Sequence, residues 1–153
     1  EPIPQPPHPP VPPFLTPTAS YALFYNNSAT GATYAAGENI AYQSTLYNTA
    51  TADIVNNNGL ITLSGGATGK AYLVNYQVTG ETANDATLAL AINGTVDSNS
   101  EIIPNSATGT SNGSYIVNVP ANSTSTVALR VVSGTVTTAS PTVGSYLSVI
   151  RIA

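Results

Sequence analysis

Residues 71–78 read Ala-Tyr-Leu-Val-Asn-Tyr-Gln-Val, and residues 126–132 read Thr-Val-Ala-Leu-Arg-Val-Val. In both stretches apolar side chains recur at every second residue. In a β-strand this spacing places them on one face of the sheet and the residues between them on the other face. Shorter stretches of this kind cover residues 20–25, 39–43, 60–64, 86–92, 114–119 and 145–152. No segment has the period of an amphipathic helix. The sequence therefore predicts an all-β protein with about ten strands.

Turn signals separate these strands. Asn58-Gly59 and Asn93-Gly94 are pairs that tolerate the positive φ angles of a type I′ turn, so we expect both to form hairpin tips. Gly65-Gly66 and residues 108–113 are predicted to be longer loops. The strand at 145–152 is apolar and alternating, and we expect it to lie in the centre of a sheet. Many short strands joined by such turns predict an antiparallel β-sandwich of the jelly-roll type.

An N-terminal arm precedes these strands. Nine of the twelve prolines fall within residues 1–17. Proline fixes φ and has no N–H, so this tract predicts an extended polyproline II segment that rises ~3.1 Å per residue and reaches roughly 50 Å. We therefore divide the chain into an arm over residues 1–18 and one domain over residues 19–153. Such an arm is a spacer or a ligand for a groove, and its apolar anchors would be Ile3, Val11, Phe14 and Leu15.

The composition excludes several classes of protein. Charged residues make up 7% of the chain, with three basic side chains against seven acidic ones, which disfavours nucleic acid as a partner. Without cysteine there is no disulfide or thiolate site. No apolar run reaches the ~18 residues of a membrane-spanning helix, so we expect no membrane insertion. A surface rich in Asn, Ser and Thr is typical of secreted β-proteins, and we expect an extracellular or cell-surface location; the family resemblance described below adds the spore surface to these.

The sequence offers no catalytic set. His8 is the only histidine and lies within the proline tract, where no fold holds it against a serine or a carboxylate. No glycine-rich phosphate loop leads into a helix, and no pair of carboxylates is indicated by spacing. We therefore expect neither an enzyme nor a cofactor.

Two acidic stretches and one lysine allow further interpretations. Residues 97–101 (Asp-Ser-Asn-Ser-Glu) and 81–85 could supply oxygen ligands to calcium, but neither has the EF-hand pattern, so turn formation by Asp and Asn is the preferred interpretation and no metal site is predicted. Lys70 stands at the head of a strand. It could form an isopeptide bond with an asparagine, although a solvated strand-end lysine is the simpler interpretation.

The nine tyrosines allow two interpretations. They could line a groove for carbohydrate, because sugars stack on flat rings. Most of them, however, stand at alternating positions within predicted strands. Burial of the ring with the hydroxyl at an interface is therefore the preferred interpretation.

The order of the strands resembles a known family. The segments that carry the resemblance are residues 60–64 (Leu-Ile-Thr-Leu-Ser), a glycine-rich connection, residues 70–78, residues 88–94 and the closing residues 146–152. Over residues 20–153 the chain resembles the TNF-like jelly roll shared with the heads of complement's collagen-tailed recognition protein. Within that family it is most similar to the C-terminal domain of bacterial BclA-type collagen-like spore-surface glycoproteins.

This resemblance implies a homotrimer. It places two groups of residues in the core or along the three-fold axis: Tyr72, Leu73 and Tyr76 from one strand, and Tyr146, Leu147 and Val149 from the last. Family members usually carry collagen repeats before the head. This chain has a proline-rich arm without the glycine period, so the arm cannot form a collagen triple helix.

Two functions are compatible with this organisation. In the first, the chain is a structural subunit that trimerises through its strand faces and docks its arm onto a neighbouring subunit, building a fibre or a surface layer. In the second, it is an adhesin-like head on a stalk that binds a protein or a glycan. The first is preferred, because an arm reaching from one particle to the next makes a contact that does not close on itself.

Overall fold

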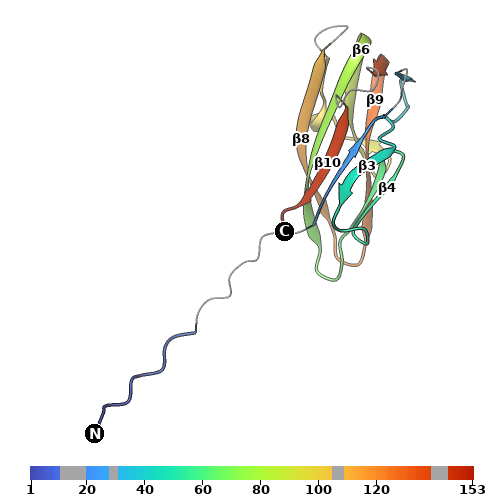
Figure 1. The fold of residues 1–153 in the computed structure, drawn as a ribbon. Coiled ribbons are helices and arrows are strands. Elements are labelled where there is room, and N and C mark those ends of the chain that lie inside the picture. Colours follow the sequence, from blue (N-terminus) through green and yellow to red (C-terminus); the bar gives the residue numbers. More distant parts are fainter. Residues whose placement is uncertain (11–19, 28–30, 105–108, 139–144) are drawn as a thin grey trace.

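The chain folds as an antiparallel β-sandwich (Figure 1), seen in a computed structural model that describes residues 1–10, 20–27, 31–104, 109–138 and 145–153. Ten strands and one 3-10 turn, η1 (Ser98–Ser100), make up the regular structure of these residues. The predicted all-β class is confirmed. Among the described residues, no helix is long and apolar enough to cross a membrane.

Two layers form the sandwich. The first, sheet A, contains in spatial order β3 (Ser44–Asn48), β1 (Tyr21–Tyr25), β10 (Tyr146–Arg151), the first half of β6 (Lys70–Ile92) and β8 (Thr110–Val119). The second, sheet B, contains β4 (Ile54–Asn57), β5 (Leu60–Ser64), β9 (Thr124–Thr138), the second half of β6 and β7 (Thr95–Val96), with β2 (Thr33–Ala35) also paired to β9.

Strand β6 connects the two layers. Residues 70–79 pair with β8 in sheet A, and residues 80–92 pair with β9 in sheet B. The sequence predicted two separate strands here, at 71–78 and 86–92. The segment between them continues the ladder to β9 with register shifts near Gly80 and Asn84, and these irregularities let one strand turn from one sheet into the other.

The core lies between the inner faces of the sheets. Phe24, Tyr72, Val74, Leu147 and Val149 enter it from sheet A, and Ile61, Leu63, Leu88, Leu90 and Leu129 enter it from sheet B; all are at most 1% exposed. Their alternation along each strand follows from the two-residue period. Burial of one such leucine stabilises the fold by about 1.5–3 kcal/mol relative to an exposed one.

Both predicted hairpin tips are confirmed. Asn58 (φ 50°) and Gly59 (φ 96°) join β4 to β5, and Asn93 (φ 51°) and Gly94 (φ 81°) join β6 to β7. The paired positive φ values are those of a type I′ turn. The predicted central position of the last strand is confirmed as well, since β10 lies between β1 and β6.

The loop predicted over residues 108–113 is wrong from Thr110 onward, because residues 110–113 open strand β8. Gly113 pairs with Tyr76 across the ladder, and a Cβ atom at Gly113 would lie 2.6 Å from atoms of the Tyr76 ring. Glycine is therefore needed at this position for close packing rather than for a turn.

The strand predicted over residues 39–43 is also wrong. Only Asn39 forms a bridge, to Arg130, although Ile40 and Tyr42 are fully buried as the alternation suggested. Side-chain amides take the place of a strand partner: Asn26 Nδ2 donates to the Ala41 carbonyl (2.6 Å) and Asn56 Nδ2 donates to the Tyr42 carbonyl (2.7 Å). The short strands β2, β3, β4 and β7 were not predicted.

Part of the arm is described. Residues 1–10 carry no helix or strand, and all of them are exposed, with Ile3 at 91%. Three of the four predicted anchors, Val11, Phe14 and Leu15, lie outside the described residues. The predicted boundary at residue 18 lies there too.

Candidate assembly surface

The face of sheet A that points away from the core is the most distinctive surface of the domain. We call it the outer face. It consists of the alternate residues of five strands: Tyr47 of β3, Tyr21, Leu23 and Tyr25 of β1, Tyr146, Ser148 and Ile150 of β10, Leu73, Asn75 and Gln77 of β6, and Asn112, Ser114 and Ile116 of β8.

Strand register arranges these residues in rows. Tyr21 stands opposite Ile150, Ile150 opposite Leu73, and Leu73 opposite Ile116. These four side chains form an apolar row across four strands. Its ends are well exposed, Tyr21 at 40% and Ile116 at 54%. The row thus places apolar side chains from four strands side by side on a face that the second sheet does not cover.

A polar row runs beside the apolar row. Ser148, Asn75 and Ser114 stand opposite one another in β10, β6 and β8. Asn75 Nδ2 donates to Ser148 Oγ (3.3 Å), and Ser114 Oγ donates to Asn75 Oδ1 (2.6 Å). The two hydrogen bonds link these uncharged groups across three strands.

An aromatic cleft opens at the other side of the outer face. The rings of Tyr21 and Tyr47 meet edge to face, with centroids 5.5 Å apart. With Leu23 and Ile150 they line a cleft of ≈ 180 Å³. Aromatic pairs of this kind supply much of the contact energy at protein interfaces.

No charged side chain belongs to the outer face within the described part of the chain. Depletion of charge is the compositional mark of the buried centre of an interface, since each charge there would lose its hydration. The outer face thus shares its lack of charge with the centres of subunit interfaces, in a chain of which only 7% is charged.

The six residues predicted for the core or interface divide into two sets. Tyr72, Tyr76, Leu147 and Val149 are buried between the two sheets, at 2% exposure or less. Leu73 and Tyr146 are partly exposed and lie on the outer face. The sequence analysis did not single out Ile116, although the alternation of residues 114–119 contains the signal that puts it on this face.

The buried tyrosines use their hydroxyls inside the domain. Tyr72 donates to the Ser64 carbonyl (2.6 Å), and burial, helped by the nearby Asp53 carboxylate, raises the pKa of Tyr72 to about 12. Tyr76 donates to the Ser100 carbonyl (2.6 Å). Burial also raises the pKa of Tyr42, which donates to the Gln77 carbonyl. These rings are part of the core rather than of a sugar-binding groove.

The segment 97–101, considered above for calcium, forms a capped turn. Asp97 Oδ2 accepts from the Tyr115 hydroxyl (2.5 Å), and Oδ1 accepts from the Asn99 backbone N–H (3.0 Å). The Tyr115 hydrogen bond lowers the pKa of Asp97, and the same bond raises the pKa of Tyr115. The carboxylate thus caps η1 and ties it to β8. No cluster of three metal-ligating residues occurs among the described residues; the side chains of residues 81–84 lie outside them.

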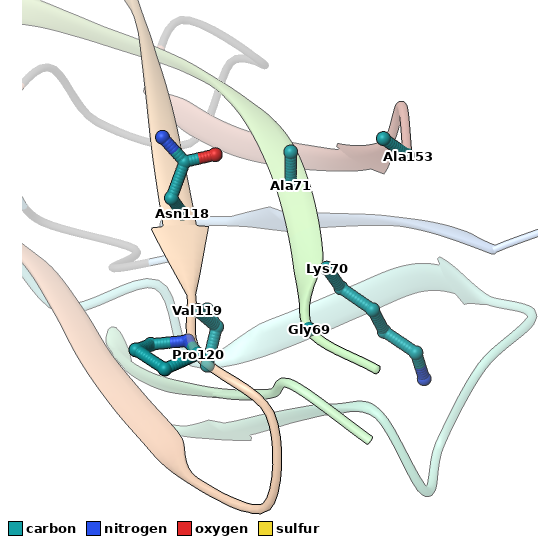
Figure 2. Close-up of a pocket in the computed structure, with 7 residues that line it drawn as sticks. All are labelled: Gly69, Lys70, Ala71, Asn118, Val119, Pro120 and Ala153. Carbon is teal, nitrogen blue, oxygen red and sulfur yellow. The ribbon is translucent and has the colours of Figure 1, made fainter. Parts of the chain in front are cut away.

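Lys70 forms an ion pair rather than a contact with asparagine. Its Nζ lies 2.8 Å from Asp53 Oδ2. Beside Lys70 lies an open hollow of ≈ 330 Å³, where the start of β6 meets the end of β8 and the last residue of the chain. It is lined by Ala71, Asn118, Val119, Pro120 and Ala153 (Figure 2). Its lining is mostly apolar and holds no nucleophile–base pair. His8 is exposed in the arm.

Comparison with known proteins shows the fold. No protein-family model matches the chain, and no match to a curated protein sequence was found. The structure of Eiger TNF from S. frugiperda superposes with a TM-score of 0.62 at 12% identity, covering 88% of this chain and 92% of that one.

Two further structures are similar. Murine APRIL at pH 5.0 gives a TM-score of 0.59 at 8% identity, covering 87% of this chain and 98% of that one. The globular domain of the zebrafish complement 1qA protein gives 0.56 at 11% identity, covering 88% and 98%. The predicted TNF-like jelly roll is confirmed.

Proposed function

We propose that this chain is a structural subunit that assembles through its jelly-roll domain into a homotrimer and uses its proline-rich arm to join trimers into a fibre or layer. The observation that supports the trimer is the outer face: an uncharged sheet face with an exposed apolar row and an aromatic cleft. Three-fold closure would remove that apolar surface from water in each subunit.

The arm supports the second part of the proposal. Residues 1–10 are exposed and make no strand or helix of their own. A polyproline segment is already extended, so little conformational entropy is lost when it docks. Ile3, together with Val11, Phe14 and Leu15, would supply the apolar contacts. A spore- or cell-surface layer of the kind that BclA-type proteins form is the setting we propose for such a polymer.

Substitution on the outer face tests the trimer. Ile150 lies in the middle of the apolar row, and Ile150→Glu would place a carboxylate within the proposed interface. We expect light scattering coupled to size exclusion to give a trimer mass for the arm-deleted wild-type domain and a monomer mass for this variant. Val132→Glu is the matched control, because Val132 is an exposed apolar residue of β9 in sheet B. A monomer mass for the unsubstituted domain would overturn the trimer.

A further inference from the structure

Strand β8 leaves one edge of sheet A open. Within the described part of the chain, β8 pairs with β6 alone and forms the margin of the sandwich (Figure 1). It is ten residues long, and it contains no proline, no charged residue and no register shift. Proteins normally protect such an edge with a charge, a proline or a bulge, because it pairs readily with another chain.

The hydrogen-bond pattern identifies the groups on this edge. The Gly80 N–H donates to the Gly109 carbonyl (3.1 Å), so these two residues form a hydrogen-bonded pair. In an antiparallel ladder the backbone N–H and C=O groups of successive residues point alternately toward and away from the paired strand. The backbone groups of residues 111, 113, 115, 117 and 119 therefore also point toward β6. The N–H and C=O groups of Thr110, Asn112, Ser114, Ile116 and Asn118 therefore point to the open edge.

The start of the arm is complementary to such an edge. Residues 1–6 read Glu-Pro-Ile-Pro-Gln-Pro, with a proline at every second position. In an extended chain, alternate residues direct their backbone groups to opposite sides. Ile3 and Gln5 would therefore present N–H groups on one side, and the prolines would leave the other side without donors. Such a segment can add to a sheet edge and then blocks further addition.

We propose that Glu1–Gln5 of one subunit adds as an antiparallel strand along the open edge of β8 in a second subunit, with Ile3 opposite Ile116 and Gln5 opposite Ser114. This inference rests on the proposed function and identifies the site where the arm docks. Opposite residues of a ladder share a face. Ile3 would thus extend the apolar row beyond Ile116, and the Gln5 amide would extend the polar row beyond Ser114.

The remaining contact lies at the end of β8. In the same register Glu1 stands opposite Asn118, which borders the hollow lined by Val119, Pro120 and Ala153 (Figure 2). A parallel arrangement with Ile3 at Ile116 would instead set Gln5 beside Asn118 and Glu1 beside Ser114, and it would lose the match to the polar row.

The direction of the added strand fixes how subunits are arranged. β8 ends next to Ala153, and the domain's first strand begins at that same end, where Arg151 N–H donates to the Ser20 carbonyl. An arm that adds antiparallel to β8 begins beside the C-terminal end of that strand and runs toward Thr110. It therefore leaves the acceptor subunit at the end of the domain that contains Thr110. The donor domain then lies beyond Thr110, with its arm-bearing end facing the acceptor. This is a head-to-tail contact, which continues into an open fibre.

Several arms per particle would strengthen the contact. One arm adds only a few backbone hydrogen bonds, so a single docking event is weak. In a trimer, three arms that reach the same neighbour bind with a high effective concentration once the first has docked.

Disulfide trapping in the full-length chain tests the site, because the natural sequence has no cysteine. Residues opposite each other in a hydrogen-bonded pair have Cα atoms ~5.5 Å apart, within the range of a disulfide. We expect Ile3→Cys/Ile116→Cys and Gln5→Cys/Ser114→Cys fibres to give a ladder of covalent oligomers on a denaturing gel after oxidation. Pro4→Cys/Ile116→Cys is the control; its cysteines would face opposite sides of the sheet, and we expect no ladder.

Other outcomes overturn the inference in distinct ways. Fibres without a ladder from either pair would show that the arm docks elsewhere, while the proposed function stands. A ladder from Gln5→Cys/Asn118→Cys in place of Gln5→Cys/Ser114→Cys would show parallel addition. A cross-link confined to single chains would show that each arm binds its own domain. Absence of fibres from the unsubstituted full-length chain would overturn the proposed function itself.

Discussion

At the scale of the residue, two turn glycines differ in how much room there is for a Cβ atom. Gly59 and Gly94 both adopt positive φ in Asn-Gly turns, but a Cβ atom at Gly59 would lie 2.3 Å from the Ile40 carbonyl oxygen, whereas one at Gly94 meets no atom within 4 Å. We expect Gly94→Ala to lower the free energy of unfolding by about 1–2 kcal/mol through backbone strain. Gly59→Ala should lower the free energy of unfolding by a further ~1–3 kcal/mol, because the backbone at Ile40 must move.

Urea unfolding followed by far-ultraviolet circular dichroism measures both glycine variants. Equal losses at the two positions would show that the carbonyl of Ile40 is free to shift, contrary to the packing described.

The Asp97–Tyr115 hydrogen bond gives a pH signature. Because the folded-state pKa of Asp97 is lowered, its contribution to stability is present above the carboxyl's ordinary pKa near 3.8 and is lost as the pH falls through the lowered value. We expect Tyr115→Phe to have a lower melting temperature than wild type at neutral pH, and the difference to shrink in acid. A difference that is constant with pH would mean that the hydroxyl does not stabilise the ionised carboxylate.

The buried tyrosines predict a loss of stability at high pH. The ordinary pKa of tyrosine is 10.0, and that of Tyr72 is raised to about 12. A raised pKa means that stability is complete below pH 10 and is lost as the pH rises toward 12. In an ultraviolet absorbance titration, we expect Tyr72 to ionise only together with unfolding. Complete ionisation of all nine tyrosines near pH 10, with the fold intact, would contradict the burial.

At the scale of the element, β10 contributes side chains to both faces of sheet A. Leu147 is fully buried between the sheets, while Ile150 lies on the outer face. We expect Leu147→Ala to lower the free energy of unfolding by about 2–5 kcal/mol. Ile150→Ala should cost less than about 1 kcal/mol in the isolated subunit and should weaken association instead. Denaturant unfolding and sedimentation of both variants check this; strong unfolding by Ile150→Ala would place that side chain in the core.

The elements predicted from the sequence are those whose burial alternates. Residues 71–78 and 126–132 predicted the first part of β6 and of β9, because one side chain in two enters the core there. Strand β3 was missed because it lies at a sheet edge and none of its residues is buried, so its sequence, Ser-Thr-Leu-Tyr-Asn, shows no alternation of apolar and polar side chains. The alternation correctly indicated that Ile40 and Tyr42 are buried. It did not indicate that the side-chain amides of Asn26 and Asn56 would replace a strand partner there.

The outer face could be predicted only in part, for a related reason. Local sequence shows that Tyr146 and Leu147 point to opposite faces, but not which face the second sheet covers. Register across strands brings Tyr21, Ile150, Leu73 and Ile116 into one row, and these residues are far apart in the chain. Only pairing between strands reveals such a row.

At the scale of the whole molecule, the domain and the arm have complementary features. The domain presents an uncharged outer face and an open edge at β8, and residues 1–10 of the arm are exposed. Assembly that depends on apolar contact and backbone hydrogen bonds, rather than on ion pairs, should tolerate salt. We expect fibres formed by the full chain to persist in high salt, as measured by sedimentation; their dissolution would indicate an electrostatic contact.

The measurement that tests the central claim most directly compares the full chain with a version that starts at Thr18, using light scattering and negative-stain electron microscopy. The account predicts fibres from the full chain and discrete trimers from the shortened one. Identical discrete particles from both would contradict it: the arm would then be a spacer, and the protein would be better described as a binding head on a stalk.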